Sequence, residues 1–191
     1  SAQKVGPAVA ADMAKGAIIS VILSLIAIFV YILARFRNVA FSIGSVLALT
    51  VDTLIIVGMY SICWGWMPFS LEVDQTFIGA VLTAIGYSIN DKVVVFDRIR
   101  ENLGLYPKRE TERLFNDSLN ETLARTIVTS ATTLLVLLCI FFLGGDSIRS
   151  FAFAMILGVI FGTLSSIFLA APIAFRTLGK KRVVEAAVAK A

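Results

Sequence analysis

The chain alternates between long apolar segments and short charged ones. Five apolar runs reach the length of about 20 residues that a helix needs to cross a hydrocarbon core of about 30 Å. In lipid every backbone amide must be paired within its own segment, so the runs are predicted to be helices rather than strands. The predicted spans cover about 16–34, 39–63, 75–96, 122–143 and 150–175. We therefore expect an all-α, polytopic bundle of five transmembrane helices, forming one membrane domain over 1–191.

The polar segments divide the chain between the two sides of a membrane. Residues 1–15 are predicted to be a polar junction on the outer side of the membrane, within a longer chain. Residues 97–103 are expected to continue the third helix into water as far as the break at Pro107. The charged stretch over about 104–121, with its regularly placed apolar residues, predicts a helix lying on the cytoplasmic surface. Residues 176–191 are predicted to be a cytoplasmic tail.

The distribution of basic residues predicts the orientation. The 64–74 loop has no Lys or Arg and carries Trp64 and Trp66, which suit an interfacial aromatic belt. The short 144–149 turn has only Arg149. The first loop, the long third loop and the stretch after the last span hold most of the positive charge, and by the positive-inside rule they face the cytoplasm. These basic residues are Arg35, Arg37, Arg98, Arg100, Lys108, Arg109, Arg113, Arg176, Lys180, Lys181 and Arg182. The N-terminus is therefore expected outside and the C-terminus inside.

Composition narrows the chemistry. The chain is 58% hydrophobic and 16% charged, with a net charge of +4 dispersed between the apolar runs, which suits lipid headgroups and argues against nucleic-acid binding. It has no histidine, which excludes a His-rich metal site, and no metal or cofactor is expected. Cys63 and Cys139 are interpreted as packing residues. No HExxH or GxSxG motif is present, so an enzyme is not expected.

Three ionisable residues lie in or at the mouth of apolar runs, namely Asp52, Asp91 and Arg125. Such a side chain costs about 2.5–3.5 kcal/mol or more at a helix centre, so it is usually paired, hydrated or functional. Asp91 and Arg125 lie near the inner ends of antiparallel spans and are expected at similar depth. We predict an ion pair that protonation of Asp91 would release, which would act as a proton-operated latch. The alternative is a static pair that only fixes two helices, with Arg125 extending to the interface.

The neighbouring polar residues have less certain roles. Asp52 is expected to be neutral or hydrogen-bonded in the bundle interior. Lys92 points about 100° away from Asp91 on a helix and is expected to reach the inner interface. Either a relay role or a structural role is open to a larger polar set, namely Asp52, Asn90, Thr129 and Thr133.

Two stripes of small residues indicate close helix packing. In the fifth span Gly158, Gly162 and Ser166 are candidate packing residues within a stripe that runs from Ala154 to Ala170. The third span has a comparable face, made of Gly79, Thr83, Gly86 and Asn90. Simple packing is one interpretation, and a hydrated, movable seam beside the charges is the other.

Several motifs, in order along the chain, resemble one known family. They are VGP at Val5–Pro7 with AAD at Ala10–Asp12, GYSIND at Gly86–Asp91, VVFDRIREN at Val94–Asn102, TLART at Thr122–Thr126, TSATT at Thr129–Thr133 and GTLSSI at Gly162–Ile167. Together they resemble the SecF family of protein-export subunits. The motif from Gly86 to Asn102 is the most specific, and the resemblance covers essentially the whole chain.

The resemblance implies half of a transmembrane domain of the resistance-nodulation-division (RND) superfamily, in the bacterial inner membrane. It implies a subunit that works with SecD, separate or fused, and with the SecYEG translocon and YajC. That subunit would use the proton gradient to promote export of unfolded polypeptides. Asp91 and Arg125 would belong to the proton relay, and Asn90 would align with the SecD aspartate of the other half. Two departures are Val51-Asp52, where the family often has His-Asp, and Lys92, in place of a small or polar residue.

Two other functions remain open. One is half of a different RND-type proton-coupled exporter, which the identity of the external domain would reveal. The other is a non-transporting membrane scaffold whose buried charges only specify packing. Asp91→Asn keeps the shape of the side chain and removes its titration, so this change separates the scaffold from the proton-driven motor.

Overall fold

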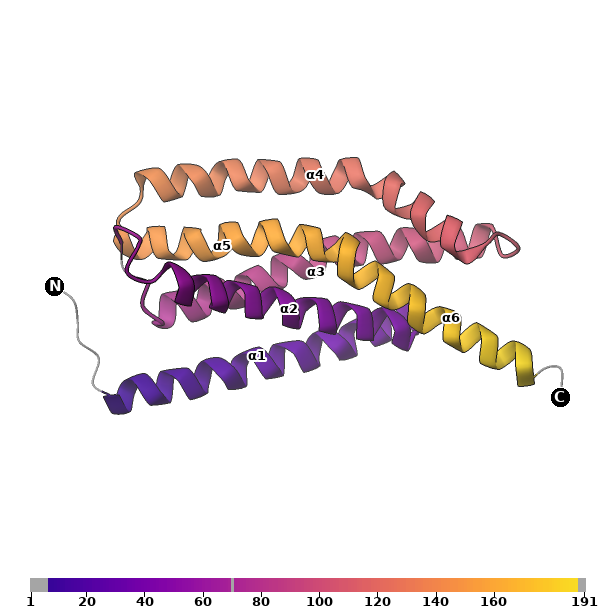
Figure 1. The fold of residues 1–191 in the computed structure, drawn as a ribbon, viewed down its shortest axis with the longest axis horizontal. Helices are drawn as coiled ribbons and strands as arrows, with labels where there is room; N and C mark the ends of the chain where they lie inside the picture. The colour runs from indigo at the N-terminus through magenta and orange to yellow at the C-terminus, as the bar shows by residue number, and fades with distance from the viewer. Residues whose placement is uncertain (1–6, 70, 189–191) are drawn as a thin grey trace.

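The computed structural model describes residues 7–69 and 71–188, and this part of the chain is a helical bundle without strands. The predicted all-α fold is confirmed. Its elements in chain order are α1 (Pro7–Phe36), α2 (Val39–Cys63), α3 (Gln75–Leu105), α4 (Thr111–Leu143), α5 (Asp146–Ser165), the π-helix η1 (Ser166–Ala170) and α6 (Ala171–Val188). The helices run roughly along the long axis of the molecule (Figure 1).

Five stretches are long and apolar enough to cross a membrane, as the hydropathy pattern predicts. They are Ala11–Phe36, Val39–Cys63, Gln75–Leu105, Thr111–Leu143 and Ile148–Gly179. The last stretch combines α5, η1 and the beginning of α6. Because all backbone pairing occurs within each helix, such a bundle satisfies the main constraint that lipid imposes.

Short polar connections set the ends of the spans. Arg37 has a φ of 51° in the turn after α1. The side chain of Asn38 then accepts a 3.0 Å hydrogen bond from the amide of Ala40, which caps α2. Asp74 caps α3 in the same way, by accepting a 2.8 Å hydrogen bond from the amide of Phe77.

The segments between the apolar runs are more helical than expected. α1 begins at Pro7, so the described part of the expected junction is helix, and residues 1–6 lie outside the described part. α3 continues to Leu105, as expected for 97–103. The separate surface helix expected over about 104–121 does not form, because α4 begins at Thr111 and runs unbroken to Leu143. No Gly or Pro interrupts α4, and Leu114 and Phe115 in its first turns are buried against the bundle.

A π-helix separates α5 from α6, where the sequence predicted one helix over 150–175. The amide of Ala171 donates to the carbonyl of Ser166, five residues back. Pro172 follows directly and has no amide hydrogen to continue the α-helical ladder. The chain bends here, and α6 leaves the axis of α5 (Figure 1).

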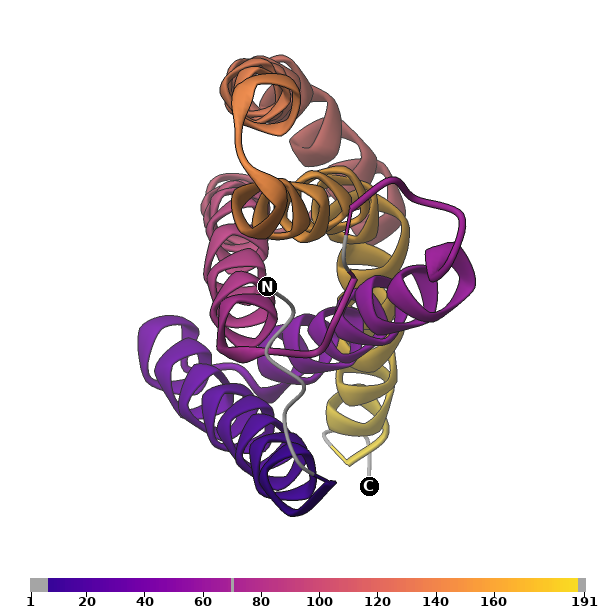
Figure 2. The same cartoon turned by 90° about the vertical axis from the view of Figure 1, so that its left-hand side faces the viewer.

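The centre of the bundle is formed by α2, α3 and α5, while α1 and α4 lie on opposite sides (Figure 2). Close approach depends on glycine at two positions in particular. A Cβ on Gly162 would lie 2.6 Å from Ser88 Oγ, and one on Gly44 would lie 2.7 Å from the carbonyl oxygen of Ala170. Larger side chains would push α3 from α5 and α2 from η1.

Two hydrophobic clusters fill the interior, one toward each end of the bundle. On α2 the first cluster includes Leu49 and Ile56, and the second includes Ala48. On α3 the first cluster ends at Ile85 and the second resumes at Val95. The segment between them on α3, residues 86–94, also carries buried polar and charged side chains, namely Ser88, Asp91 and Lys92.

Candidate functional site

A buried polar layer lies between the two hydrophobic clusters and draws on α2, α3, α4 and α5. Its side chains are held in the interior of a bundle that is otherwise apolar. They are Asp52 from α2, Ser88, Asp91 and Lys92 from α3, Ser130 from α4, and Thr163 and Ser165 from α5. Polar groups require hydrogen-bond partners in a low-dielectric interior, and these side chains form two hydrogen-bonded sets.

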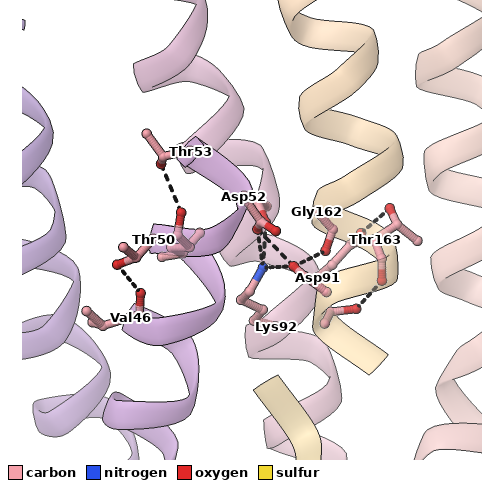
Figure 3. Close-up of polar contacts among 12 residues, drawn as sticks. Val46, Thr50, Asp52, Thr53, Asp91, Lys92, Gly162 and Thr163 are labelled. Atoms are coloured by element: carbon pink, nitrogen blue, oxygen red, sulfur yellow. Dashed lines mark hydrogen bonds and ion pairs between the residues drawn. The ribbon is translucent and has the colours of Figure 1, made fainter. Parts of the chain in front are cut away.

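The first set is centred on an ion pair between Lys92 and Asp52 (Figure 3). Lys92 Nζ lies 3.0 Å from Asp52 Oδ2 and donates to Ser88 Oγ at 2.5 Å and Ser165 Oγ at 2.9 Å. All three ammonium hydrogens therefore have acceptors. The expectation that Lys92 would extend to the inner interface is wrong, since its side chain has 0% exposure. Its position on α3 directs it toward α2, where a carboxylate is available.

Asp52 lies in the bundle interior, as expected, and its two oxygens are used unequally. Oδ2 accepts hydrogen bonds from Ser88 Oγ at 2.7 Å and Ser165 Oγ at 2.8 Å, in addition to the one from Lys92. Oδ1 is buried and has no hydrogen-bond partner in the described part of the chain. The ion pair thus joins α2, α3 and α5 through one oxygen atom.

The second set is centred on Asp91, which is 3% exposed. Thr163 Oγ1 donates a 3.1 Å hydrogen bond to Asp91 Oδ2, and Ser130 Oγ lies 2.6 Å from Thr163 Oγ1. With the Thr163 hydrogen directed to the carboxylate, Ser130 is the donor to Thr163. A file of hydroxyl groups therefore leads from α4 across α5 to the carboxylate on α3.

Arg125 does not form the predicted ion pair with Asp91. The side chain of Arg125 is exposed, and no ion pair to it occurs among the described residues. The reason is the rotation of α4, which turns Thr126 and Ser130 inward and carries Arg125 about 100° around the helix.

The other polar candidates also face away from Asp91. Thr129 Oγ1 donates to the carbonyl of Arg125 at 2.9 Å, and Thr133 Oγ1 donates to the carbonyl of Thr129 at 2.9 Å. Thr133 also accepts a 3.3 Å hydrogen bond from the hydroxyl of Tyr87. Asn90 is exposed. The hydroxyl groups that do bond to the charged side chains were not among the predicted site residues; they belong to Ser88, Thr163 and Ser165. Ser88 could have been predicted, because it lies four residues before Lys92 and therefore on the same face of α3.

The small-residue stripes have different roles. Gly158, Gly162 and Ser166 are buried, and the two glycines pack against Ala84 and Ser88 of α3. The third-span stripe faces outward, and all its members are exposed: Gly79, Thr83, Gly86 and Asn90. The α3 residues that contact α5 lie on an adjacent face of that helix, so α3 keeps a small and polar face that no neighbour covers among the described residues.

The fold and the buried polar layer define a polytopic helical membrane protein that holds ionisable groups between its spans. Residues 1–180 match the family described as protein export membrane protein SecD/SecF, C-terminal. The chain belongs to this family and is a multi-pass protein of the bacterial inner membrane.

The curated relatives are described as protein translocase subunit SecF. The chain is 53% identical over 169 residues to the protein translocase subunit SecF of Rhodothermus marinus, covering 88% of this chain and 54% of that protein. It is 41% identical over 175 residues to the protein translocase subunit SecF of Haemophilus influenzae, covering 92% of this chain and 52% of that protein. The chain therefore spans about half the length of these relatives.

Solved structures share the fold. A crystal structure of SecDF in a super-membrane-facing form superimposes with a TM-score of 0.80 at 38% identity, covering 96% of this chain and 23% of that chain. SecDF from Thermus thermophilus, described as a translocon-associated membrane protein, also gives a TM-score of 0.80, at 40% identity, covering 92% of this chain and 23% of that chain.

Proposed function

We propose that this chain is part of a proton-driven accessory unit of protein export, which works with SecD at the SecYEG translocon. The role is transport rather than catalysis. The observation that carries the proposal is Asp91, a buried carboxylate that accepts a hydrogen bond from Thr163 while a cation, Arg125, lies open on the neighbouring helix. A carboxyl group in this position can exchange a proton and change its partners when it does so.

The exchange alters the hydrogen bonds around Asp91. The ionised carboxylate only accepts, so the Thr163 hydroxyl points toward it. The protonated carboxyl group must itself donate, and the file through Ser130 then reorients or opens. Protonation also weakens the attraction that Asp91 exerts on Arg125. We propose that Arg125 approaches Asp91 in another packing of the helices, so that the latch predicted from the sequence describes a second state.

The membrane potential provides enough energy for such a change. A charge that crosses a potential of 100 mV releases about 2.3 kcal/mol. Two packings of a bundle that differ by a few kcal/mol can be shifted by that amount. In the proposed orientation, with the N-terminus outside and the C-terminus inside, protons move toward the end of the bundle where the basic residues gather.

The outward face of α3 supports the assignment of SecD as the neighbour. Gly79, Thr83, Gly86 and Asn90 are exposed on a helix that also carries Asp91. An amide side chain facing lipid lacks partners, whereas small residues allow another helix to approach. The SecDF structures that share this fold are much longer chains. We propose that the SecD half covers this face and brings its own polar groups next to Asp91.

The experiment is the export of a reporter protein by cells or vesicles that contain the protein with SecD, measured with and without a proton gradient. Asp91→Asn should abolish the part of export that depends on the gradient while the complex still assembles. Asp146→Asn is the matched control, because that carboxylate is 74% exposed in the first turn of α5. Normal gradient-dependent export by an assembled Asp91→Asn complex would instead favour a scaffold.

A further inference from the structure

The ion pair between Asp52 and Lys92 takes no part in the proton exchange proposed for Asp91. Among the ion pairs in the described part of the chain, it is the most completely buried. The two side chains are 3% and 0% exposed. A buried pair of this kind is a weak source of stability, because desolvation offsets much of the attraction between the charges. Its cost therefore calls for an explanation other than packing strength.

The geometry ties the pair to Asp91 in two ways. Lys92 follows Asp91 directly on α3, so the ion pair begins at the residue next to the carboxylate. The pair also contacts Ser165, which lies on the same turn of α5 as Thr163, the hydrogen-bond donor to Asp91. Figure 3 shows Asp52, Lys92, Asp91 and Thr163 gathered around this turn.

This turn of α5 is packed tightly against α3, so the two helices cannot move independently here. Gly162 is in such close contact with Ser88 that a Cβ there would lie 2.6 Å from Ser88 Oγ. Ser88 in turn is bonded to both charges of the pair. The regular α-helix ends immediately after Ser165, where η1 begins. Single-turn π-helical segments frequently occur at functional sites.

We propose that Asp52 and Lys92 are positioning residues for Asp91, because their ion pair places balanced charges beside it and anchors the α5 turn that carries Thr163. The inference rests on the proposed proton exchange at Asp91. Lys92 would then have a function, which is to influence how readily its neighbour Asp91 binds a proton.

The charged groups that face Asp91 are few, so their effects have clear signs. They are Lys92, the next residue on α3, Arg125 on α4, and Asp52 on α2, which is paired with Lys92, while the nearby part of α5 offers only hydroxyls. Loss of the positive charge of Lys92 favours the protonated form of Asp91, and loss of the negative charge of Asp52 favours the ionised form. Loss of both charges leaves the balance nearly unchanged.

The test is an infrared titration of the Asp91 carboxyl band, identified by its absence in Asp91→Asn, in the complete protein with SecD in lipid vesicles. Lys92→Gln should move the midpoint of the titration to higher pH by about one unit, and Asp52→Asn should move it to lower pH by a similar amount. The Asp52→Asn/Lys92→Gln double variant should lie within about 0.5 unit of the wild type. Gln and Asn keep hydrogen-bonding groups in place, so each variant retains polar partners in the interior.

Midpoints that stay at the wild-type value in both folded single variants would overturn the proposal and leave a pair that serves packing alone. Shifts of the same sign would also overturn it. Where one single variant fails to accumulate, the sign of the other decides. Where both fail, the double variant decides, and a midpoint displaced by more than one unit in that variant contradicts the proposal. The readout does not involve export, so failure of the proposed function would appear separately, in Asp91→Asn.

Discussion

The hydroxyl of Thr163 donates a 3.1 Å hydrogen bond to the carboxylate of Asp91, across the interface of α5 and α3. This contact takes the place of the Asp91–Arg125 ion pair that the sequence predicted. It makes α5 the immediate partner of the Asp91 carboxylate, and it leaves Arg125 available for another state of the bundle or for a neighbouring subunit.

Thr163→Val removes the hydroxyl and keeps the shape of the side chain. We expect a loss of stability of about 1–3 kcal/mol, because the Asp91 carboxylate and the Ser130 hydroxyl lose their shared partner. Gradient-dependent export should fall with it. Thr177→Val on α6 is the control, since Thr177 donates only to the carbonyl of Ile173. Equal effects of the two changes on export would show that the Thr163 hydroxyl has no special role.

Arg125→Ala should leave the folded bundle almost unchanged, because Arg125 is exposed and forms no ion pair in the described part of the chain. Gradient-dependent export should nevertheless be lost, if Arg125 meets Asp91 in a second packing. Thermal unfolding in detergent measures the first effect, and reporter export measures the second. Arg176→Ala, a change of another exposed arginine, is the control and should preserve export. Full export by Arg125→Ala would remove Arg125 from the mechanism.

Gly162→Ala tests the close contact of α3 and α5. The added Cβ would lie 2.6 Å from Ser88 Oγ, so the helices must separate and the polar layer must distort. We expect a destabilisation of about 1–3 kcal/mol. Gly104→Ala is the matched control, because a Cβ at Gly104 meets nothing within 4 Å. Unfolding temperatures of the two variants that agree would contradict the packing described for Gly162.

Gly86→Leu tests the outward face of α3. A Cβ at Gly86 meets nothing within 4 Å in this chain, so the larger side chain should leave the isolated bundle intact. Association with SecD should weaken, because the small residue is expected to allow a helix of SecD to approach. Copurification of SecD measures the effect. Gly16→Leu on the exposed surface of α1 is the control. Normal recovery of SecD with Gly86→Leu would place its binding surface elsewhere.

The helices could be predicted from the sequence because each membrane span is a continuous run of apolar residues. The partners of the buried charged residues could not be predicted in this way, because they depend on the rotation of each helix about its axis. A turn of about 100° separates Arg125 from Thr126, and it decides which of them is buried. The same consideration applies to Lys92, whose partner lies 40 residues earlier on α2. Hydropathy could not reveal that partner, because each residue considered alone is an unpaired charge whose burial is unfavourable, and only the folded structure brings the two together.

The protonation of Asp91 is the central claim, and an infrared titration in lipid vesicles tests it most directly. In the complete protein with SecD, we expect a carboxyl band that appears and disappears reversibly as the pH is varied over the range in which the complex stays folded, and that is missing in Asp91→Asn. Over the same range, a carboxyl group that never changes its protonation state would contradict the proposed proton exchange.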